Sequence, residues 1–544
     1  MLFKPKFFTL LQSGISKQQL IKDLLSGVVV GIVALPLAIA FAIASGVSPE
    51  KGLITAIIAG FIISFLGGSR VQIGGPTGAF IIIVFGIVQN YGLDGLLIST
   101  VIAGVLLVIF GVLKLGNLLK YFPHPLIVGF TSGIAVVIFS TQIRDALGLE
   151  IEKVPSDFIE KWIVYAQNLN NINPAALIIT VSTILIGVFW KKISTKIPGS
   201  FIAIIFTTLA VKYFEIDVAT IETFFGEIPR KIAFSIPTID WNDIPEYFSP
   251  AITIALLGGI ESLLSAVVAD GMISGKHRSN TELIAQGIAN IVTPFFGGIP
   301  ATGAIARTAT NVKNGGRTPI AGMTHAVVLL LIMFFLGSLA KLIPMATMAG
   351  ILIVVAYNMS EWRSFVSILK GSFFDIIVLI TTFLLTILVD LTIAIQVGVV
   401  LSALLFMKRM ADIAEKRITN TIDSDIIDNY DSLPKGVAIY EISGPLFFGS
   451  AKTYSEIIEE ISISNKILII RMRHVSFIDS TGFQNLKSTL RIIQAKGVLV
   501  IFSGVSETLR EDLMKNGIEK CIPTSQILDS FDKAIKFAEE KVSK

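Results

Sequence analysis

Two short segments of the chain carry the same tripeptide, Thr-Gly-Ala, shortly after glycine and proline. The first is GGPTGAF at 74–80, and the second is GGIPATGAIA at 297–306. Glycine and proline end a preceding helix, and proline suits the first turn of a new one. A helix N-terminus has unpaired N–H groups and a partial positive charge, which together favour an anion. We therefore expect helix starts near Thr77 and Thr302 to hold one anion, whose approach to the backbone is allowed by Gly78, Ala79, Gly303 and Ala304.

Tight helix packing is the alternative interpretation of both segments, because small residues also let membrane helices approach each other closely. Packing alone does not require a proline beside each copy. We favour the anion site for that reason.

One carboxylate lies in the middle of a long apolar run. Glu261 lies within SPAITIALLGGIESLLSAVVA at 249–269, twelve residues after its first residue and eight before its last. An ionised carboxylate at the centre of a bilayer costs roughly 2.5 kcal/mol or more, so such a residue is usually functional. Glu261 can carry a proton, or it can hold a cation such as sodium with the hydroxyl of Ser265 one turn further on. Arg307, three residues after the second tripeptide, can attract the anion or neutralise Glu261.

The elements that position these residues must lie in a membrane. Of the 544 residues, 53% are apolar and only 15% are charged, and the mean hydropathy is +0.77. A water-facing surface of this size needs more ionic groups. Since a spanning helix takes about 20 apolar residues, a single membrane anchor is excluded. The net charge of +4 gives no reason to expect nucleic acid as a partner.

Motifs for enzyme, cofactor or metal chemistry cannot be recognised in the sequence. Cys521 is the only cysteine, the four histidines have no metal spacing, and GMISGKHR at 271–278 fails the spacing of a phosphate-binding loop. Neither a nucleophile elbow nor a catalytic triad is present. We therefore expect no enzyme activity, no cofactor and no metal, but a coupling ion that is either a proton or sodium.

Long apolar runs separated by short polar segments occupy residues 24–407, after an N-terminal segment at 1–23. The fourteen expected spans lie near 24–44, 51–68, 75–91, 95–113, 124–141, 174–190, 198–214, 250–268, 282–297, 301–312, 319–340, 344–358, 373–389 and 391–407. With the N-terminus in the cytoplasm, most basic loops fall inside, as the positive-inside rule requires. We expect a multi-pass protein of the cell inner (cytoplasmic) membrane with both termini in the cytoplasm.

The sequence also contains an internal repeat. GLITAIIAGFIISFLGG at 52–68 matches ELIAQGIANIVTPFFGG at 282–298 at seven of seventeen positions, and a Thr-Gly-Ala follows each copy. Two halves of seven spans are implied, at about 24–214 and 250–407. An odd number of spans inverts the second half in the bilayer, as in many secondary transporters. The two helix starts are then expected to point at one another.

The C-terminal part reads as a soluble domain at 434–544, after a linker at 408–433. Strand-like stretches at 437–443, 466–472 and 497–504 alternate with helical stretches. The pattern predicts a small α/β domain.

These residues resemble the SulP (sulfate permease) anion transporter family. The resemblance rests on ALPLAIAFAIASGV at 34–47, GGPTGAF at 74–80, GGIESLLSAVVADG at 258–271 and the segment from 299 to 326, and it covers nearly the whole chain. FIDSTGF at 477–483 is similar to the STAS domain, which anti-sigma-factor antagonists share. In those antagonists the serine at the position of Ser480 is phosphorylated, whereas in a transporter an Asp-Ser helix cap is the favoured interpretation.

The resemblance implies an all-α polytopic membrane protein with fourteen transmembrane segments in two inverted repeats of seven. It further implies UraA-like core and gate domains, elevator-type motion, a homodimer and a cytoplasmic STAS domain, which is a candidate contact for a regulator. Glu261 takes the position that the family associates with cation coupling. The resemblance implies an aspartate that serves sodium at this position in bicarbonate transporters of the family. Glutamate together with Ser265 favours proton symport instead. The substrate residues carried over by motif are Thr77, Gly78, Ala79, Phe80, Thr302, Gly303, Ala304 and Arg307.

The sequence thus predicts a secondary active transporter of a small anion, with sulfate first. Sodium-dependent bicarbonate transport is the second expectation, and transport of dicarboxylates such as fumarate or succinate is the third. An anion channel and a membrane-anchored STAS regulator are the alternatives from other classes.

Overall fold

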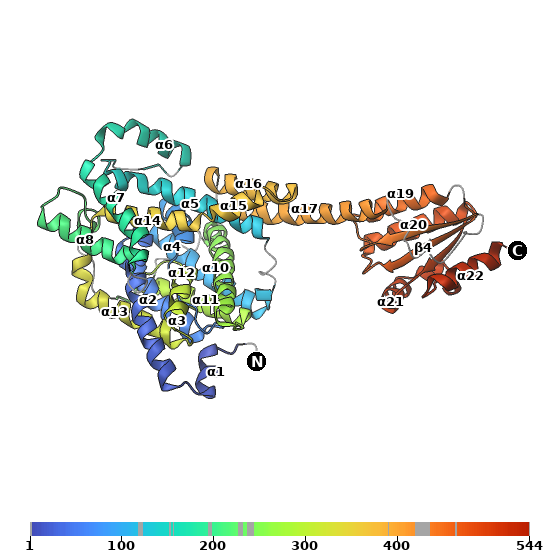
Figure 1. Cartoon of the computed structure of the whole chain (residues 1–544), viewed down its shortest axis with the longest axis horizontal. Coiled ribbons are helices and arrows are strands. Elements are labelled where there is room, and N and C mark those ends of the chain that lie inside the picture. The colour runs from blue at the N-terminus through green and yellow to red at the C-terminus, as the bar shows by residue number, and fades with distance from the viewer. Residues whose placement is uncertain are drawn as a thin grey trace. The chain divides into compact units, whose positions relative to one another are not determined.

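The structure is a computed structural model of the chain, and it divides into two compact units, Met1–Val400 and Leu401–Lys544 (Figure 1). The residues that it describes are 3–117, 123–151, 154–155, 157–193, 198–226, 232–236, 244–389, 391–418, 436–462 and 465–542.

The first unit is almost entirely helical. Its helices are α1 (Lys6–Ser13), α2 (Lys17–Ala44), α3 (Pro49–Leu66), α4 (Ile81–Val112), α5 (His124–Leu147), α6 (Phe158–Gln167), α7 (Pro174–Phe189), α8 (Gly199–Tyr213), α9 (Ile221–Phe225), α10 (Ile244–Ile273), α11 (Ser279–Val292), α12 (Ile305–Lys313), α13 (Ile320–Ala340), α14 (Met345–Met359), α15 (Trp362–Ile368), α16 (Phe373–Leu388) and α17 (Leu391–Ile418). The last of these continues into the second unit, and through the start of the segment expected as a linker.

Local sequence explains where several of these helices begin and break. Pro49 opens α3, and Pro174 opens α7 behind Asn173, whose side chain accepts the N–H groups of Ala175 and Ala176. Both patterns are typical of helix starts, because proline lacks the N–H that would be unpaired there. Gly92, with φ 69° and ψ −172°, interrupts α4 between the third and fourth expected spans.

Six helices of the described residues are long and apolar enough to cross a membrane, and four shorter helices are also apolar. The chain is therefore a multi-pass membrane protein, as expected. Each of the fourteen expected spans overlaps a helix of the structure, and α4 overlaps both the third and the fourth. The number that crosses the bilayer, and the inversion of one half relative to the other, stay predictions.

The helices of the first unit pack in two groups. The larger group comprises α2, α3, α4, α10, α11, α12 and α13. The smaller group comprises α5, α7, α8, α14 and α16. The short helix η1 (Gly78–Phe80), which carries part of the first Thr-Gly-Ala, contacts α5 of the smaller group and continues into α4 of the larger one. The candidate anion site therefore lies where the two groups meet.

The second unit contains the expected α/β domain. Its strands β3 (Val437–Ser443), β4 (Ile467–His474) and β5 (Leu499–Ser503) form a parallel sheet in the order β3-β4-β5. Its helices are α19 (Ala451–Ser462), α20 (Ser480–Ala495), α21 (Glu507–Lys515) and α22 (Phe531–Val542).

Side chains of β4 alternate between two apolar cores, as the period of a strand requires. Leu468 and Ile470 belong to the core on one face, whereas Ile467 and Ile469 belong to the core on the other, with Ala534 and Ile535 of α22. No helix is among those expected from the sequence pattern at the residues of α22. This helix completes the domain because it covers the second apolar face of the sheet.

Candidate functional site

The two Thr-Gly-Ala segments are joined directly in the structure. The short strands β1 (Gly74–Gly75) and β2 (Thr302–Gly303) pair antiparallel, with Gly74 opposite Gly303 and Gly75 opposite Thr302. The N–H of Ala304 also donates to the carbonyl of Ile73, at 2.8 Å. Helix η1 begins at Gly78, and α12 begins at Ile305. The two expected helix starts therefore lie side by side, although more than 200 residues separate them in the sequence.

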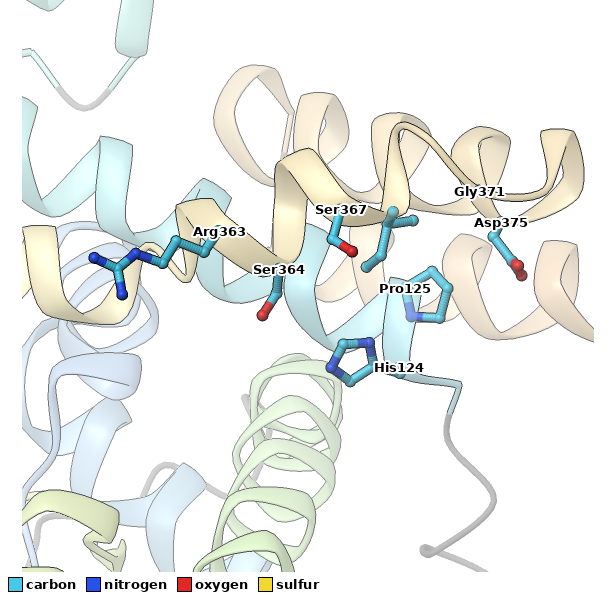
Figure 2. Close-up of a pocket in the computed structure, with 8 residues that line it drawn as sticks. His124, Pro125, Arg363, Ser364, Ser367, Gly371 and Asp375 are labelled. Carbon is cyan, nitrogen blue, oxygen red and sulfur yellow. The ribbon is translucent and has the colours of Figure 1, made fainter.

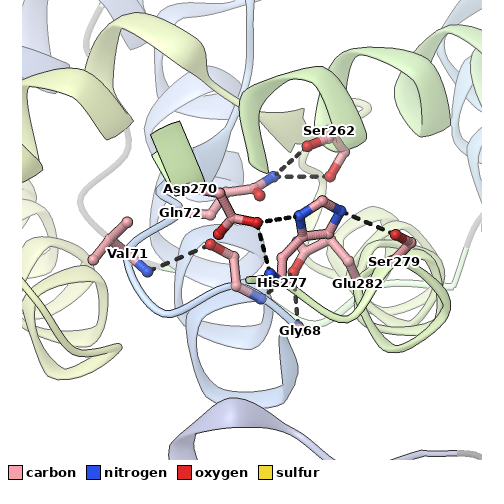
Figure 3. A network of polar contacts seen from close by, with 9 residues as sticks. Gly68, Val71, Gln72, Ser262, Asp270, His277, Ser279 and Glu282 are labelled. Carbon is pink, nitrogen blue, oxygen red and sulfur yellow. Dashed lines mark hydrogen bonds and ion pairs between the residues drawn. The ribbon is translucent and has the colours of Figure 1, made fainter. Parts of the chain in front are cut away.

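We call residues 67–80 the first arm and residues 297–308 the second arm. Each arm is fixed by a polar side chain of a neighbouring helix. Both the Gly68 and Ser69 N–H groups donate to one carboxylate oxygen of the fully buried Glu282 on α11, at 2.7 and 2.9 Å (Figure 3). On the other arm, the N–H of Ile299 donates to the hydroxyl of Thr55 on α3, at 2.7 Å. Buried backbone groups in the loops before both motifs therefore have partners, which holds the loops in one conformation.

Helix α10 contacts both arms through Glu261 and a backbone carbonyl. The Thr77 hydroxyl donates to a carboxylate oxygen of Glu261 at 3.0 Å, and the Thr302 hydroxyl donates to the carbonyl of Gly258 at 2.8 Å. Glu261 and Gly258 are one helical turn apart. The structure thus places the predicted coupling carboxylate in contact with the first predicted anion arm.

Ser265 lies one turn beyond Glu261, but its hydroxyl pairs elsewhere. It contacts the Thr308 hydroxyl of α12 at 3.4 Å, and that hydroxyl accepts the N–H of Ile73 at 3.0 Å. Ser265 is fully buried. It therefore connects α10 with the second arm rather than forming a hydrogen bond with Glu261.

Arg307 crosses from the second arm to the first. This side chain of α12 is 2% exposed, and its Nη2 donates to the carbonyl of Pro76. Its Nη1 is buried and has no hydrogen-bond partner. No ion pair joins Arg307 to Glu261 among those formed by the described residues. A buried guanidinium nitrogen without a partner is costly, so an anion or a water molecule beside it would stabilise the site.

Gln72 is a further residue of the candidate site, and no motif of the sequence points to it. Its Nε2 donates to the hydroxyl and carbonyl of Ser262 on α10, at 2.8 and 3.2 Å (Figure 3). Its Oε1 is buried without a partner. A Cβ atom added to Gly303 would lie 1.6 Å from this Nε2, so the amide occupies the space that a side chain at 303 would need. In the sequence, Gln72 is marked only as a single amide side chain beside the first motif, which is too little to predict its place in the site.

The remaining motif residues lie in two environments. A Cβ atom at Gly78 would meet Met359 of α14 at 2.7 Å and Phe41 of α2 at 3.6 Å, so Gly78 faces the contact between the two helix groups. Ala79 and Phe80 are 4% and 1% exposed and belong to the apolar core. The structure thus brings all the predicted substrate residues into one region.

Ser480 lies in the second unit and is the exposed first residue of α20. The preceding residue, Asp479, caps this helix by accepting the Gly482 N–H at 2.6 Å, and its other oxygen accepts the N–H of Phe448 at 3.0 Å. The expected Asp-Ser cap is therefore present, with Asp479 as the capping side chain. Phosphorylation of Ser480 stays a prediction.

The structure also contains a pocket of about 590 Å³, whose lining residues Figure 2 shows. It is lined by residues of α5, α15 and the segment around the start of α16, which are His124, Pro125, Arg363, Ser364, Ser367, Ile368, Gly371 and Asp375. None of the predicted substrate residues lines it.

Comparison with known proteins agrees with this fold. The Sulfate permease family matches residues 20–382, and the STAS domain matches residues 433–534. The chain therefore belongs to the sulfate permease (SulP) family of membrane anion transporters and carries a C-terminal STAS domain. The resemblance found in the sequence is confirmed.

Relatives of the chain include two named transporters and a solved structure. The chain is 43% identical to "Putative sulfate transporter YvdB" of Bacillus subtilis (strain 168), over 95% of this chain and 98% of that protein. It is 30% identical to "Bicarbonate transporter BicA" of Picosynechococcus sp., over 95% of this chain and 94% of that one. The inward-facing structure of the murine anion transporter Slc26a9 matches with a TM-score of 0.87 at 19% identity, over 98% of this chain and 94% of that one, so it shares the fold.

Proposed function

We propose that this chain is a secondary active transporter that moves sulfate together with protons, with Glu261 as the proton carrier. The observation that carries the proposal is the pairing of Gly74–Gly75 with Thr302–Gly303 beside Glu261. This pairing brings two helix starts, one carboxylate and the guanidinium of Arg307 to the same place. Such a site has N–H donors and a cation for an anion, and a separate group for a proton.

The substrate class follows from the chemistry of these donors. Backbone N–H groups and a guanidinium suit any small oxyanion, and the hydroxyls of Thr77 and Thr302 already have acceptors within the protein. Sulfate is the first candidate because a relative at 43% identity bears the name of a sulfate transporter. Sodium-dependent bicarbonate transport is the second, because a relative at 30% identity is named a bicarbonate transporter. Dicarboxylates are the third.

Coupling between proton and anion is supported by the contact of Thr77 with Glu261. The Thr77 hydroxyl donates to the carboxylate at 3.0 Å, and Thr77 is the N-cap of η1. Protonation of Glu261 weakens this charge-assisted hydrogen bond. The first arm then responds to the proton, so that binding of one ligand changes the affinity for the other.

Alternating access is proposed as an elevator-type movement of the larger helix group against the smaller one. Gly78 lies between them, with Met359 and Phe41 as its neighbours. A glycine there presents little side-chain bulk to a sliding contact.

We further propose that the protein resides in the cell inner membrane with both termini in the cytoplasm. It would form a homodimer, and its STAS domain would contact a regulator.

Uptake into proteoliposomes tests the function and the coupling together. The purified full chain is supplied with labelled sulfate, bicarbonate or fumarate under an imposed proton or sodium gradient. We expect proton-driven, saturable uptake of sulfate. Glu261→Gln should still bind sulfate but no longer respond to the proton gradient. Glu246→Gln is the matched control, because Glu246 is an exposed carboxylate at the start of the same helix.

Other outcomes of this experiment identify the alternatives. Gradient-dependent uptake that survives in Glu261→Gln would contradict the proposed proton carrier. Sodium-driven bicarbonate uptake would favour the second candidate. Unitary currents would indicate a channel, and a cellular phenotype that persists in Gly303→Trp would indicate a regulator acting through its STAS domain.

A further inference from the structure

Three basic side chains from separate segments gather around the C-terminal end of α3. The N–H of Lys6 on α1 donates to the carbonyl of Gly67 at 2.9 Å, and the N–H of Arg278 donates to the carbonyl of Gly68 at 3.0 Å. Arg70 follows two residues after Gly68 on the same loop. These backbone hydrogen bonds place Lys6, Arg70 and Arg278 in one region, although they come from α1, the loop after α3 and the loop before α11.

Helix α1 is held firmly in this arrangement. The Arg278 Nη1 donates to the carbonyl of Lys4 at 2.7 Å and to the hydroxyl of Thr9 at 3.0 Å. Phe7 and Phe8 of α1 pack on Phe65 of α3, with ring centroids 5.3 and 5.4 Å apart. The basic cluster of Lys6, Arg70 and Arg278 is therefore a fixed feature of the fold.

The acidic residues nearby are already engaged. Asp270 accepts from His277, with an Oδ2 to Nδ1 distance of 2.7 Å, and the Glu282 carboxylate accepts the N–H groups of Gly68 and Ser69 (Figure 3). The Nε of Arg70 is buried and has no hydrogen-bond partner. The basic cluster thus has more positive charge and donor capacity than its neighbours satisfy.

The neighbouring cations also change the pKa of Lys6. Partial burial, followed by the charges of Arg278 and Arg70, lowers the pKa of Lys6, while Asp270 acts in the opposite direction. Like charges held together in this way destabilise the fold unless an anion lies among them.

An apolar surface adjoins the basic cluster. Phe8 and Leu11 of α1 are 42% and 58% exposed. The first turns of α2, the next helix along the chain, also carry exposed apolar residues, which are Leu20, Ile21, Leu24 and Leu25. A short helix with basic residues at its start and exposed apolar side chains is typical of the membrane interface. The basic cluster follows the end of the apolar helix α3, at the level where lipid headgroups are expected.

We propose that Lys6, Arg70 and Arg278 bind the phosphate group of an anionic phospholipid, whose acyl chains lie along the exposed apolar residues of α1 and α2. The guanidinium and ammonium groups donate to the phosphate oxygens, and the apolar surface adjoins the chains. Free phosphate and sulfate offer the same oxyanion chemistry to the basic cluster. Only a lipid also uses the apolar surface, and for that reason the lipid is the assigned ligand.

Binding of phosphatidylglycerol to the purified full chain tests this proposal. The lipid is titrated into the detergent-solubilised protein and bound lipid is counted by native mass spectrometry, with phosphatidylcholine as the reference lipid. We expect selective binding of phosphatidylglycerol that weakens about fivefold for each lost cation in Arg70→Gln and Lys6→Gln. Arg70→Lys keeps the charge and should keep most of the binding. Lys370→Gln removes an exposed cation elsewhere in the first unit and should change nothing.

Two results would overturn the proposal. One is equal affinity for phosphatidylglycerol in the double variant, Lys6→Gln with Arg70→Gln, and in Lys370→Gln. The other is binding of inorganic phosphate that depends on Arg70, together with phosphatidylglycerol binding that does not depend on Arg70. Leu11→Ser distinguishes a lipid from free phosphate further, because it should weaken phosphatidylglycerol binding and leave phosphate binding unchanged.

Discussion

The substitution Gly303→Ala tests whether Gln72 is the reason for glycine in the second motif. An added Cβ atom would lie 1.6 Å from the Gln72 Nε2 and 2.6 Å from its Cδ. The amide must then move, and it loses its hydrogen bonds with the hydroxyl and carbonyl of Ser262. Leaving buried polar groups unpaired costs about 1–3 kcal/mol. We expect the variant to be destabilised by that amount and to lose anion uptake.

Thermal unfolding of the purified full chain measures this effect, with Gly86→Ala as the matched control. Gly86 lies in α4, and a Cβ atom there meets nothing within 4 Å. This control should be neutral or stabilised by about 0.5–1 kcal/mol, because alanine favours a helix over glycine. A double variant with Gln72→Ala isolates the cause, since removal of the amide should make Gly303→Ala harmless. The reasoning would be refuted if Gly303→Ala and Gly86→Ala were equally stable. It would also be refuted if the changes in unfolding free energy of Gly303→Ala and Gln72→Ala simply added in the double variant.

Three further changes have expected outcomes. Arg307→Lys should reduce sulfate uptake at least tenfold while the protein still folds, because one ammonium group cannot both reach Pro76 and present a second donor as the guanidinium does; unchanged uptake kinetics would contradict this. Burial lowers the pKa of Lys161 below its ordinary value of 10.5. Lys161→Met should therefore raise the melting temperature at neutral pH, and this gain should shrink as the pH rises toward 10.5. A gain in melting temperature that is independent of pH would count against burial of the charge. Asp479→Ala should destabilise α20 by about 0.5–2 kcal/mol through loss of its cap at Gly482, measured by amide hydrogen exchange in the full chain, where unchanged protection of α20 would show that the cap is dispensable.

Much of the architecture could be predicted from the sequence because it depends on short-range patterns. Apolar runs of span length indicate membrane helices wherever they occur, since lipid cannot satisfy an exposed backbone. The short apolar runs at 437–443 and 466–472, separated by a helical stretch, predict strands of a buried sheet, and β3 and β4 occupy nearly these ranges. Helix α22 was not predicted from the sequence pattern. It is stabilised by packing on a face of the sheet, and that face exists only in the folded domain.

The candidate site could be predicted only in part. The Thr-Gly-Ala motifs and Glu261 stand out locally, since small residues beside proline and a charge in an apolar run are unusual. The roles of Gln72 and Ser265 could not be predicted, because their partners, Ser262 and Thr308, depend on how α10 lies across the two arms. For the same reason the sequence left Arg307 between two roles, whereas the structure joins it to Pro76 and forms no ion pair with Glu261 among the described residues.

By itself, the sequence determined that this is a multi-pass membrane protein of the sulfate permease family with a STAS domain, because composition, periodicity and motif are properties of neighbouring residues. Tertiary structure alone decided that Gly74–Gly75 pairs with Thr302–Gly303 and that Thr77 donates to Glu261. Contacts between residues so far apart in the chain arise when whole helices pack. The donors and the charge that would hold an anion therefore come together only in the folded membrane domain.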